Sequence, residues 1–537
     1  MFRNGEATVV KDEVLHLPDP GCRRTGSPTG GRRHDRYAIR LALTIGSAKL
    51  AANEARVSRL SRVSAPVSGS SSSVPLVSRR KGVIGSPVHR LARVSDLGWE
   101  HATTAPTPGR RAVGCSLGTL RSVKVLIGAY ACVPNTGSEG GVGWNWTVQA
   151  ARHGHDVHVI TRSNNRTVIE EELRIRPIER LTFHYYDLPR PLPAWKKRGG
   201  YYALLGYYYF WQLGVSAVAR RLDREHQFDL THHVTFVNDW MPAGVGWTGS
   251  PFLWGPVGGS TNVIPRELRE FIPREARRYE SIRRTMQVLL RSGDPFVALT
   301  RRRANVILTF TAEAVRGIPA PYRRKARPVV HIGVSSRELD APTTEPGSNE
   351  VFTIVSGSRL VHWKGFDLLI EGFARFRRTD GAAAARLLIT GEGPFRSHLE
   401  GLIRSLQVGD FVQLLGHLPS RSDVYRVVAT ADVYALPTLR DGPPVAILEA
   451  MHAGRPILCL DRGATSEMVP EHAGVKIPVR DREQVVSAIA DALAWASTHP
   501  HELRTMGIAA REHVQQRHDW KMIGESIDAL YREIATQ

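Results

Sequence analysis

Two carboxylates eight positions apart, Asp441 and Glu449, lie in the segment RDGPPVAILEAMHAGRPIL. Pro443 and Pro444 suit the start of a helix and Gly454 suits its end, which places Asp441 in the preceding loop and Glu449 two turns inside. Apolar residues flank Glu449, and an ionised group in such a setting needs a partner. Its carboxylate could accept hydrogen bonds from two sugar hydroxyls, and Asp441 could hold another. For Asp441, favourable electrostatics at the helix N-terminus is the alternative.

Two cations, Arg359 and Lys364, lie in GSRLVHWKGFD, directly after the predicted strand EVFTIVSG. Ligands of open parallel sheets bind at the carboxyl ends of the strands, so both side chains are expected at the ligand-facing edge. Two fixed cations there can neutralise a diphosphate. A pair of ordinary surface cations is the alternative, and the position after a strand favours binding.

A glycine-rich segment, GSEGGVGW, follows the first predicted strand and opens a helix. Glycines such as Gly140 and Gly141 let a backbone approach a ligand closely, and a helix N-terminus presents free N–H groups to phosphate. Tight packing of the turn is the alternative. Taken alone, the segment does not decide between the two.

Weaker candidates follow two other strands. His232 and His233 end the strand in DLTHHVTF and are expected to face the ligand, with a structural role as the alternative. The turn TGEGP, which contains Gly391 and Glu392, either lines a nucleotide pocket or only reverses the chain. The sequence holds no D-x-D motif, so a metal bridged by paired aspartates has no support.

The elements that must position these residues alternate along two stretches of the chain. Apolar strands and amphipathic helices alternate in residues 122–340 and again in 350–515, with a polar, Pro- and Gly-containing linker between them. This alternation predicts an α/β fold with a doubly wound parallel sheet in each half and a ligand site between the halves. A helix is expected at the end of the chain, in residues 516–537.

Residues 1–121 have a different composition. They carry 20 Lys and Arg against 8 Asp and Glu, a net charge of 20 − 8 = +12, which is over half of the +21 of the whole chain. They are also rich in Ser, Pro, Gly and Arg. This composition predicts a basic, disordered N-terminal extension, with an arm for RNA or an anionic surface as the alternative. The remaining body is only mildly basic, which suits anionic small molecules or lipid more than nucleic acid. Four cysteines, too far apart for a C-x-x-C motif, favour a reduced cytoplasmic setting.

Taken together and in order, these segments resemble the retaining glycosyltransferases of the GT-B fold, of the family 4 type (glycosyl transferases group 1). The resemblance spans roughly residues 122–537 and also includes PFLWGPVGG. Its most specific part is ADVYALPTLRDGPPVAILEAMHAGRPIL, which is similar to the E-x7-E segment of the family. It implies two Rossmann-like domains that face a cleft, with the terminal helix packing back on the first domain.

The resemblance also implies roles for the candidate residues. Arg359 and Lys364 match the pair that binds the donor diphosphate, Glu449 matches the acid that holds the ribose, and His233, or less well His232, falls near the histidine beside the donor sugar. The implied catalytic residues are His233, Arg359, Lys364 and Asp441. The implied donor-binding residues are Gly140, Gly141, Arg359, Lys364, Gly391, Glu392, Asp441, Gly442 and Glu449. Asp441 stands where the family usually has Glu. The Asp side chain is one methylene shorter, so its carboxylate would sit about 1.5 Å further back, which puts the donor-sugar preference in doubt.

The predicted function is therefore transfer of a sugar from a nucleotide-diphosphate donor, with retention and without a metal or other cofactor. The acceptor is expected to be a polysaccharide, a cell-surface glycan or a lipid-linked molecule, at the cytoplasmic side of a membrane. The Tyr- and Trp-rich segment 196–222 is compatible with peripheral membrane contact, although a buried helix is favoured. Alternative functions are an epimerase- or phosphorylase-like enzyme acting on sugar nucleotides, and a catalytically silent sugar-nucleotide-binding protein.

Overall fold

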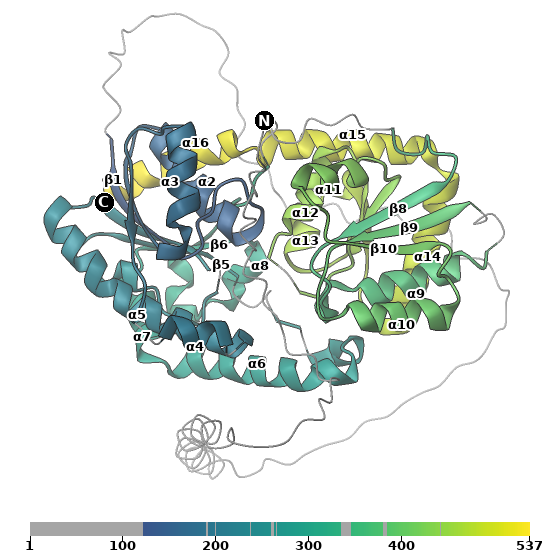
Figure 1. Ribbon diagram of the computed structural model, residues 1–537, viewed down its shortest axis with the longest axis horizontal. Helices are drawn as coiled ribbons and strands as arrows, with labels where there is room; N and C mark the ends of the chain where they lie inside the picture. The colour runs from purple at the N-terminus through teal and green to yellow at the C-terminus, as the bar shows by residue number, and fades with distance from the viewer. Residues whose placement is uncertain are drawn as a thin grey trace, which may run out of the picture. The chain divides into compact units, whose positions relative to one another are not determined.

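The computed structural model describes residues 122–189, 192–198, 200–236, 238–258, 263–264, 266–334, 345–379, 384–440 and 442–536 (Figure 1). The predicted N-terminal extension, residues 1–121, lies outside the described residues, and so does Asp441.

The first part of the described chain forms a sheet of seven parallel strands in the order β3-β2-β1-β4-β5-β6-β7. Its central strands β1, β4 and β5 are buried on both faces, as is typical of parallel sheets, and β1 and β5 are mainly apolar. The strands are β1 (Lys124–Ala129), β2 (Asp156–Thr161), β3 (Leu181–Tyr185), β4 (Leu230–Thr235), β5 (Phe252–Val257), β6 (Val306–Thr309) and β7 (Ala326–Pro328).

Helices cover both faces of this sheet. They are α2 (Ser138–Arg152), α3 (Arg166–Ile175), α4 (Leu192–Arg198), α5 (Gly200–His226), α6 (Arg274–Gly293), α7 (Pro295–Arg303) and α8 (Ala312–Gly317), with 3-10 turns η1 (Ser163–Asn165), η2 (Gly244–Gly246), η4 (Arg266–Phe271) and η5 (Ala320–Lys325). Helix α5 contains much of the Tyr- and Trp-rich segment. Its Tyr207, Tyr208 and Trp211 are buried in the core beside Trp254, so this helix packs inside the fold, as the favoured interpretation predicted.

The second part forms a sheet of six parallel strands in the order β10-β9-β8-β11-β12-β13. The strands are β8 (Phe352–Gly357), β9 (Ala385–Thr390), β10 (Val412–Gly416), β11 (Val433–Ala435), β12 (Ile457–Leu460) and β13 (Gly474–Ile477). The helices and turns are η7 (His362–Lys364), α9 (Phe366–Phe376), α10 (Arg396–Leu406), α11 (Arg421–Val428), α12 (Val445–His452), α13 (Gly463–Met468), η8 (Glu471–Ala473), α14 (Arg482–Thr498), α15 (Pro500–Arg517) and α16 (Trp520–Ala535).

Each sheet has one point where the strand order reverses direction, between β1 and β4 in the first sheet and between β8 and β11 in the second. The loops that leave two such strands turn to opposite faces of the sheet and leave a crevice at the strands' carboxyl ends, where ligands of these folds bind. The loop after β8 contains Arg359 and Lys364. The sheet topology therefore places these two residues beside the switch point of the second sheet.

The last helix, α16, lies beside elements of the first sheet (Figure 1). Tyr531 Oη is 2.7 Å from His232 Nδ1 in β4, and Asp528 Oδ1 is 3.0 Å from His155 Nε2. None of the helices that the structure describes combines the length and apolar character needed to cross a lipid bilayer.

Candidate active site

The loop after β8 carries the two candidate phosphate-binding cations. Lys364 ends η7 and is buried, with 9% of its surface exposed. The next residue, Gly365, has φ +73°, and a Cβ there would lie 2.0 Å from the carbonyl oxygen of Pro437. Only glycine therefore lets this loop pack so closely on the loop that follows β11. Leu439 N also donates to the carbonyl oxygen of Trp363 at 2.8 Å, so the backbone beside Lys364 is held in place.

The turn TGEGP supports Arg359 through its backbone. Gly391 has φ +117°, and a Cβ there would lie 2.1 Å from the carbonyl oxygen of Ser358. Leu360 N donates to the carbonyl oxygen of Glu392 at 2.9 Å. The Glu392 carboxylate, which is half exposed, instead bonds Arg396 Nη1 at 2.6 Å. The turn thus braces the loop that carries Arg359, while donor contacts by Gly391 and Glu392 stay a prediction.

Helix α12 begins and ends where its prolines and glycine predicted. Pro444 is its N-cap, Val445 its first residue, and Gly454 follows its end with φ +71°. Gly442, in the loop before the helix, lies beside the Phe310 ring, 3.7 Å from where its Cβ would be. That distance is an ordinary contact, so space alone does not require glycine at position 442.

Glu449 has a protein partner that sequence reasoning missed. Its Oε1 accepts a hydrogen bond from Arg421 Nε at 2.8 Å, and the two side chains are 14% and 29% exposed. Arg421 is the first residue of α11 and directly follows the N-cap Ser420, which forms a capping box with Asp423. The capping box marks in the sequence the start of a helix that follows a strand. Ligand residues gather at such positions in these folds, so this signal could have pointed to Arg421.

The glycine-rich segment lies inside the first turns of α2 rather than in a loop before it. A Cβ on Gly141 would lie 1.9 Å from the carbonyl oxygen of Thr136, and Val133 N donates to the carbonyl oxygen of Gly140 at 3.0 Å. Close packing of the β1–α2 loop is therefore a sufficient reason for Gly141. The start of α2 also lines a narrow pocket together with Arg421 and Val445, the first residue of α12.

The two histidines of β4 are packed on opposite faces of the sheet. His232 is fully buried, with Nε2 2.8 Å from the carbonyl oxygen of Gly255, and burial lowers its pKa to about 3. His233 is 2% exposed, with Nε2 3.3 Å from Tyr208 Oη, and burial lowers its pKa to about 4. All six residues of the strand are buried, and both rings contact protein groups. A catalytic role for His233 stays a prediction, and these contacts favour the structural alternative.

Glu280, on α6, is a second residue without a sequence signal. Its Oε1 accepts hydrogen bonds from His362 Nε2 at 2.9 Å and from Arg440 Nη2 at 2.8 Å. Burial raises the pKa of Glu280, but the His362 hydrogen bond and the Arg440 charge lower it further, to about 2. Because His362 lies two residues before Lys364 and Arg440 one residue before Asp441, this ionised carboxylate ties α6 to both donor loops.

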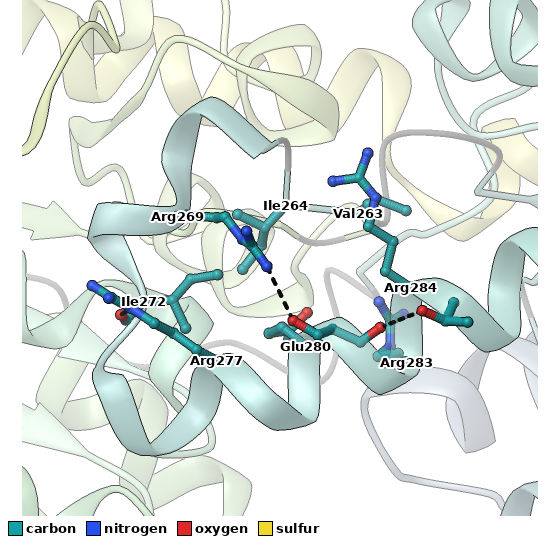
Figure 2. Close-up of a pocket in the computed structure, with 10 residues that line it drawn as sticks. Val263, Ile264, Arg269, Ile272, Arg277, Glu280, Arg283 and Arg284 are labelled. Carbon is teal, nitrogen blue, oxygen red and sulfur yellow. Dashed lines mark hydrogen bonds between the residues drawn. The ribbon is translucent and has the colours of Figure 1, made fainter.

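A pocket of about 210 Å³ opens beside Glu280 (Figure 2). Among the residues that the structure describes, its lining includes four guanidinium groups and one carboxylate, and that carboxylate already bonds His362 and Arg440. The four arginines are Arg269, Arg277, Arg283 and Arg284. The pocket is therefore strongly basic, and its chemistry suits a phosphate or carboxylate group.

Two doubly wound parallel sheets, with their candidate residues at the strands' carboxyl ends, define a two-domain α/β protein of the GT-B fold. Residues 351–494 match the family model described as glycosyl transferases group 1, which agrees with the resemblance seen in that part of the sequence.

Known proteins agree with this family and fold. WcaL of Escherichia coli (strain K12), which is named for glycosyl transfer in colanic acid biosynthesis, is 28% identical over 37% of this chain and 48% of its own length. The GDP-mannose-dependent alpha-(1-6)-phosphatidylinositol monomannoside mannosyltransferase of Mycobacterium tuberculosis (strain CDC 1551 / Oshkosh) is 32% identical over 34% of this chain and 47% of its own length. The chain thus spans about half the length of these relatives. The structure of Anabaena Alr3699/HepE in complex with UDP-glucose has a TM-score of 0.51 and 16% identity, over 76% of this chain and 99% of that one.

Proposed function

We propose that the protein is a glycosyltransferase that moves a sugar from a nucleotide-diphosphate donor to an acceptor with retention of anomeric configuration. One observation carries the proposal: the loops after β8, β9 and β11 are joined by hydrogen bonds at the carboxyl edge of the second sheet. These loops hold Arg359 and Lys364 and lead into α12, where Glu449 is paired with Arg421. The name of the Mycobacterium tuberculosis relative and the UDP-glucose complex of the Anabaena protein support a sugar-nucleotide donor.

The proposed roles follow from charge and position. The departing diphosphate gains negative charge, and Arg359, Lys364 and the N–H groups at the start of α2 stabilise it. In this proposal these groups replace a metal ion. In this proposal the Glu449 carboxylate, oriented by Arg421, accepts a hydrogen bond from a ribose hydroxyl. The leaving phosphate takes the proton of the acceptor hydroxyl.

The basic pocket beside Glu280 indicates the chemistry of the acceptor. It adjoins the two donor loops through the Glu280 contacts to His362 and Arg440, and four arginines line it. An acceptor with a phosphate or carboxylate group, such as a lipid-linked sugar or an acidic glycan, would find several charge-assisted donors there.

Helices α6 and α7 form the surface that we propose for peripheral membrane contact. Five large apolar side chains with 38% to 56% exposure lie within 18 residues of each other along the chain: Ile282, Val288, Leu289, Phe296 and Leu299. Exposed arginines flank them on the same helices, with Arg274, Arg277 and Arg278 before Ile282 and Arg302 after Leu299. Apolar side chains among cations suit the interface of an anionic membrane.

Flotation with vesicles tests the membrane part of the proposal. The full chain should float with vesicles that contain anionic lipid, and Leu289→Glu should reduce the bound fraction severalfold. Ile508→Glu, at an equally exposed apolar residue on α15, is the matched control and should leave binding unchanged. Equal loss in both variants would contradict a contact through α6 and α7.

The central proposal is tested by a donor screen followed by product analysis. UDP-, GDP- and ADP-sugars are compared by thermal shift, and the stabilising donor is then assayed with lipid-linked and acidic glycan acceptors. A transferred sugar with retained configuration is the expected result. Turnover of the donor without an acceptor would indicate an epimerase- or phosphorylase-like enzyme, and binding of a donor without any turnover would indicate a silent binding protein.

A further inference from the structure

Three histidines that the proposed reaction does not use lie together in the first sheet domain. His158 is on β2, His184 is on the edge strand β3, and His226 is the last residue of α5. One ring nitrogen of each lies within 4.8 Å of the others, and His158 Nδ1 is 3.0 Å from His184 Nε2. Such a gathering of imidazoles from three elements far apart in the sequence brings three nitrogen ligands close together.

We propose that His158, His184 and His226 form a binding site for a divalent transition metal of the Zn²⁺ class. Imidazole nitrogen suits Zn²⁺, Cu²⁺ and Ni²⁺. Tetrahedral Zn²⁺ holds its nitrogen ligands at about 2.0–2.1 Å, which separates them from one another by about 3.3 Å. The closest pair, at 3.0 Å, is already near that separation. His184 and His226 are only half-buried, so small rotations of their side chains can shorten the remaining distances between ring nitrogens to this value.

The surroundings of His158 fit a metal ligand. Its Nδ1 points to the cluster, and its other nitrogen, Nε2, lies 3.6 Å from Asp156 Oδ1. Ligating histidines usually direct their second N–H to a carboxylate, which fixes the tautomer and raises the basicity of the ligand. The Phe228 ring lies against His158 and His226, with centroid distances of 5.1 and 5.7 Å, and forms an apolar wall on one side. Water completes the coordination from the partly exposed side.

The position of the cluster indicates a structural metal. His226 ends α5 just before β4 and His158 is the third residue of β2, so these two ligands lie toward the end of the sheet where strands begin, whereas His184 is the fourth of the five residues of the edge strand β3. The candidate donor residues instead follow the carboxyl ends of the strands. A metal here joins the edge strand β3 to β2 and to the end of α5, and its binding does not depend on the proposed sugar transfer.

The test measures metal binding by the untagged full chain after chelator treatment, with Zn²⁺ and with Co²⁺ as a spectroscopic probe. The chain should bind one equivalent, and Co²⁺ should give the visible absorption of a tetrahedral nitrogen site. His184→Gln and His226→Gln should weaken binding at least 100-fold, and Asp156→Asn by about 10- to 100-fold. His501→Gln, at an exposed histidine on α15, is the matched control and should bind as the native chain does.

The replaced side chains are partly exposed, so each variant is expected to fold. Circular dichroism and donor binding check this. Absence of a bound equivalent at micromolar metal would overturn the site. Equal binding by His184→Gln, His226→Gln and His501→Gln would do the same, because the metal would then be held elsewhere on the surface.

Discussion

Arg421 Nε lies 2.8 Å from Glu449 Oε1 and joins the start of α11 to the middle of α12. The sequence placed Glu449 in an apolar setting where it needed a partner, and a ligand was the expected one. The structure supplies a guanidinium instead. A ribose would therefore meet a carboxylate that Arg421 already orients, which lowers the cost of organising the site when the donor binds.

Arg421→Ala should weaken nucleotide-sugar binding about tenfold, because a charge-assisted hydrogen bond that orients Glu449 contributes on the order of 1.5 kcal/mol. Isothermal titration with the preferred donor measures the change in Kd. Arg426→Ala, on the same helix but 67% exposed and paired with Asp423, is the matched control and should leave the Kd unchanged. Equal effects of the two substitutions would argue against a positioning role for Arg421.

Lys364→Ala should lower kcat by about 100-fold or more, since a buried cation beside the leaving diphosphate acts where charge develops. Steady-state rates of sugar transfer measure the effect, with the exposed Lys521→Ala as the control. If turnover stayed the same in Lys364→Ala, the diphosphate role of this lysine would have to be abandoned.

Asp441→Glu tests the departure from the usual family pattern. The added methylene moves the carboxylate forward by about 1.5 Å, so the ratio of kcat/KM values between competing donor sugars should change several-fold while the fold stays intact. Competition assays with pairs of donors measure the ratio. An unchanged ratio for every pair would show that this carboxylate does not select the donor sugar.

Glu280→Ala should lower the free energy of unfolding by about 3 kcal/mol, because it leaves Arg440 and His362 buried without their shared carboxylate. The same substitution should lower kcat/KM, since both donor loops lose their tie to α6. Calorimetry and transfer rates measure the two effects. Glu275→Ala, at an exposed position of the same helix, should change neither, and a comparable loss there would point to a general effect on α6.

Acid should destabilise the protein below about pH 6.5 because buried histidines resist protonation. Burial lowers the pKa of His232 and His331 to about 3 and that of His233 to about 4, while in the unfolded chain these groups take up protons near pH 6.5. Their contribution to stability is thus complete above that pH and falls toward pH 4, by up to about 1.4 kcal/mol per pH unit for each histidine.

Urea midpoints measured between pH 7.5 and pH 5 check this dependence. His331→Gln should flatten the slope by the equivalent of one proton, whereas His501→Gln, at an exposed histidine, should not change it. A midpoint that stays constant over this range would contradict the neutral state of these buried rings.

The sequence by itself determined the features that local patterns encode. Apolar strands that alternate with amphipathic helices predicted the α/β class and the two parallel sheets, because burial on both faces needs continuous apolar runs. Pro444 and Gly454 marked the limits of α12, since proline starts and left-handed glycine ends a helix. The positions of Arg359 and Lys364 directly after β8 followed from the same reasoning.

Only the tertiary structure decided which side chains meet. Glu280 bonds Arg440 across 160 positions and His232 bonds Tyr531 across 299, and no local pattern reports contacts of that span. The sequence placed the two histidines of β4 at the end of a strand, but their burial and their contacts with Tyr531 and Tyr208 depend on which elements cover that strand. Glu449 shows the same division: its need for a partner was readable from apolar neighbours, but the choice of Arg421 depended on how α11 packs beside α12.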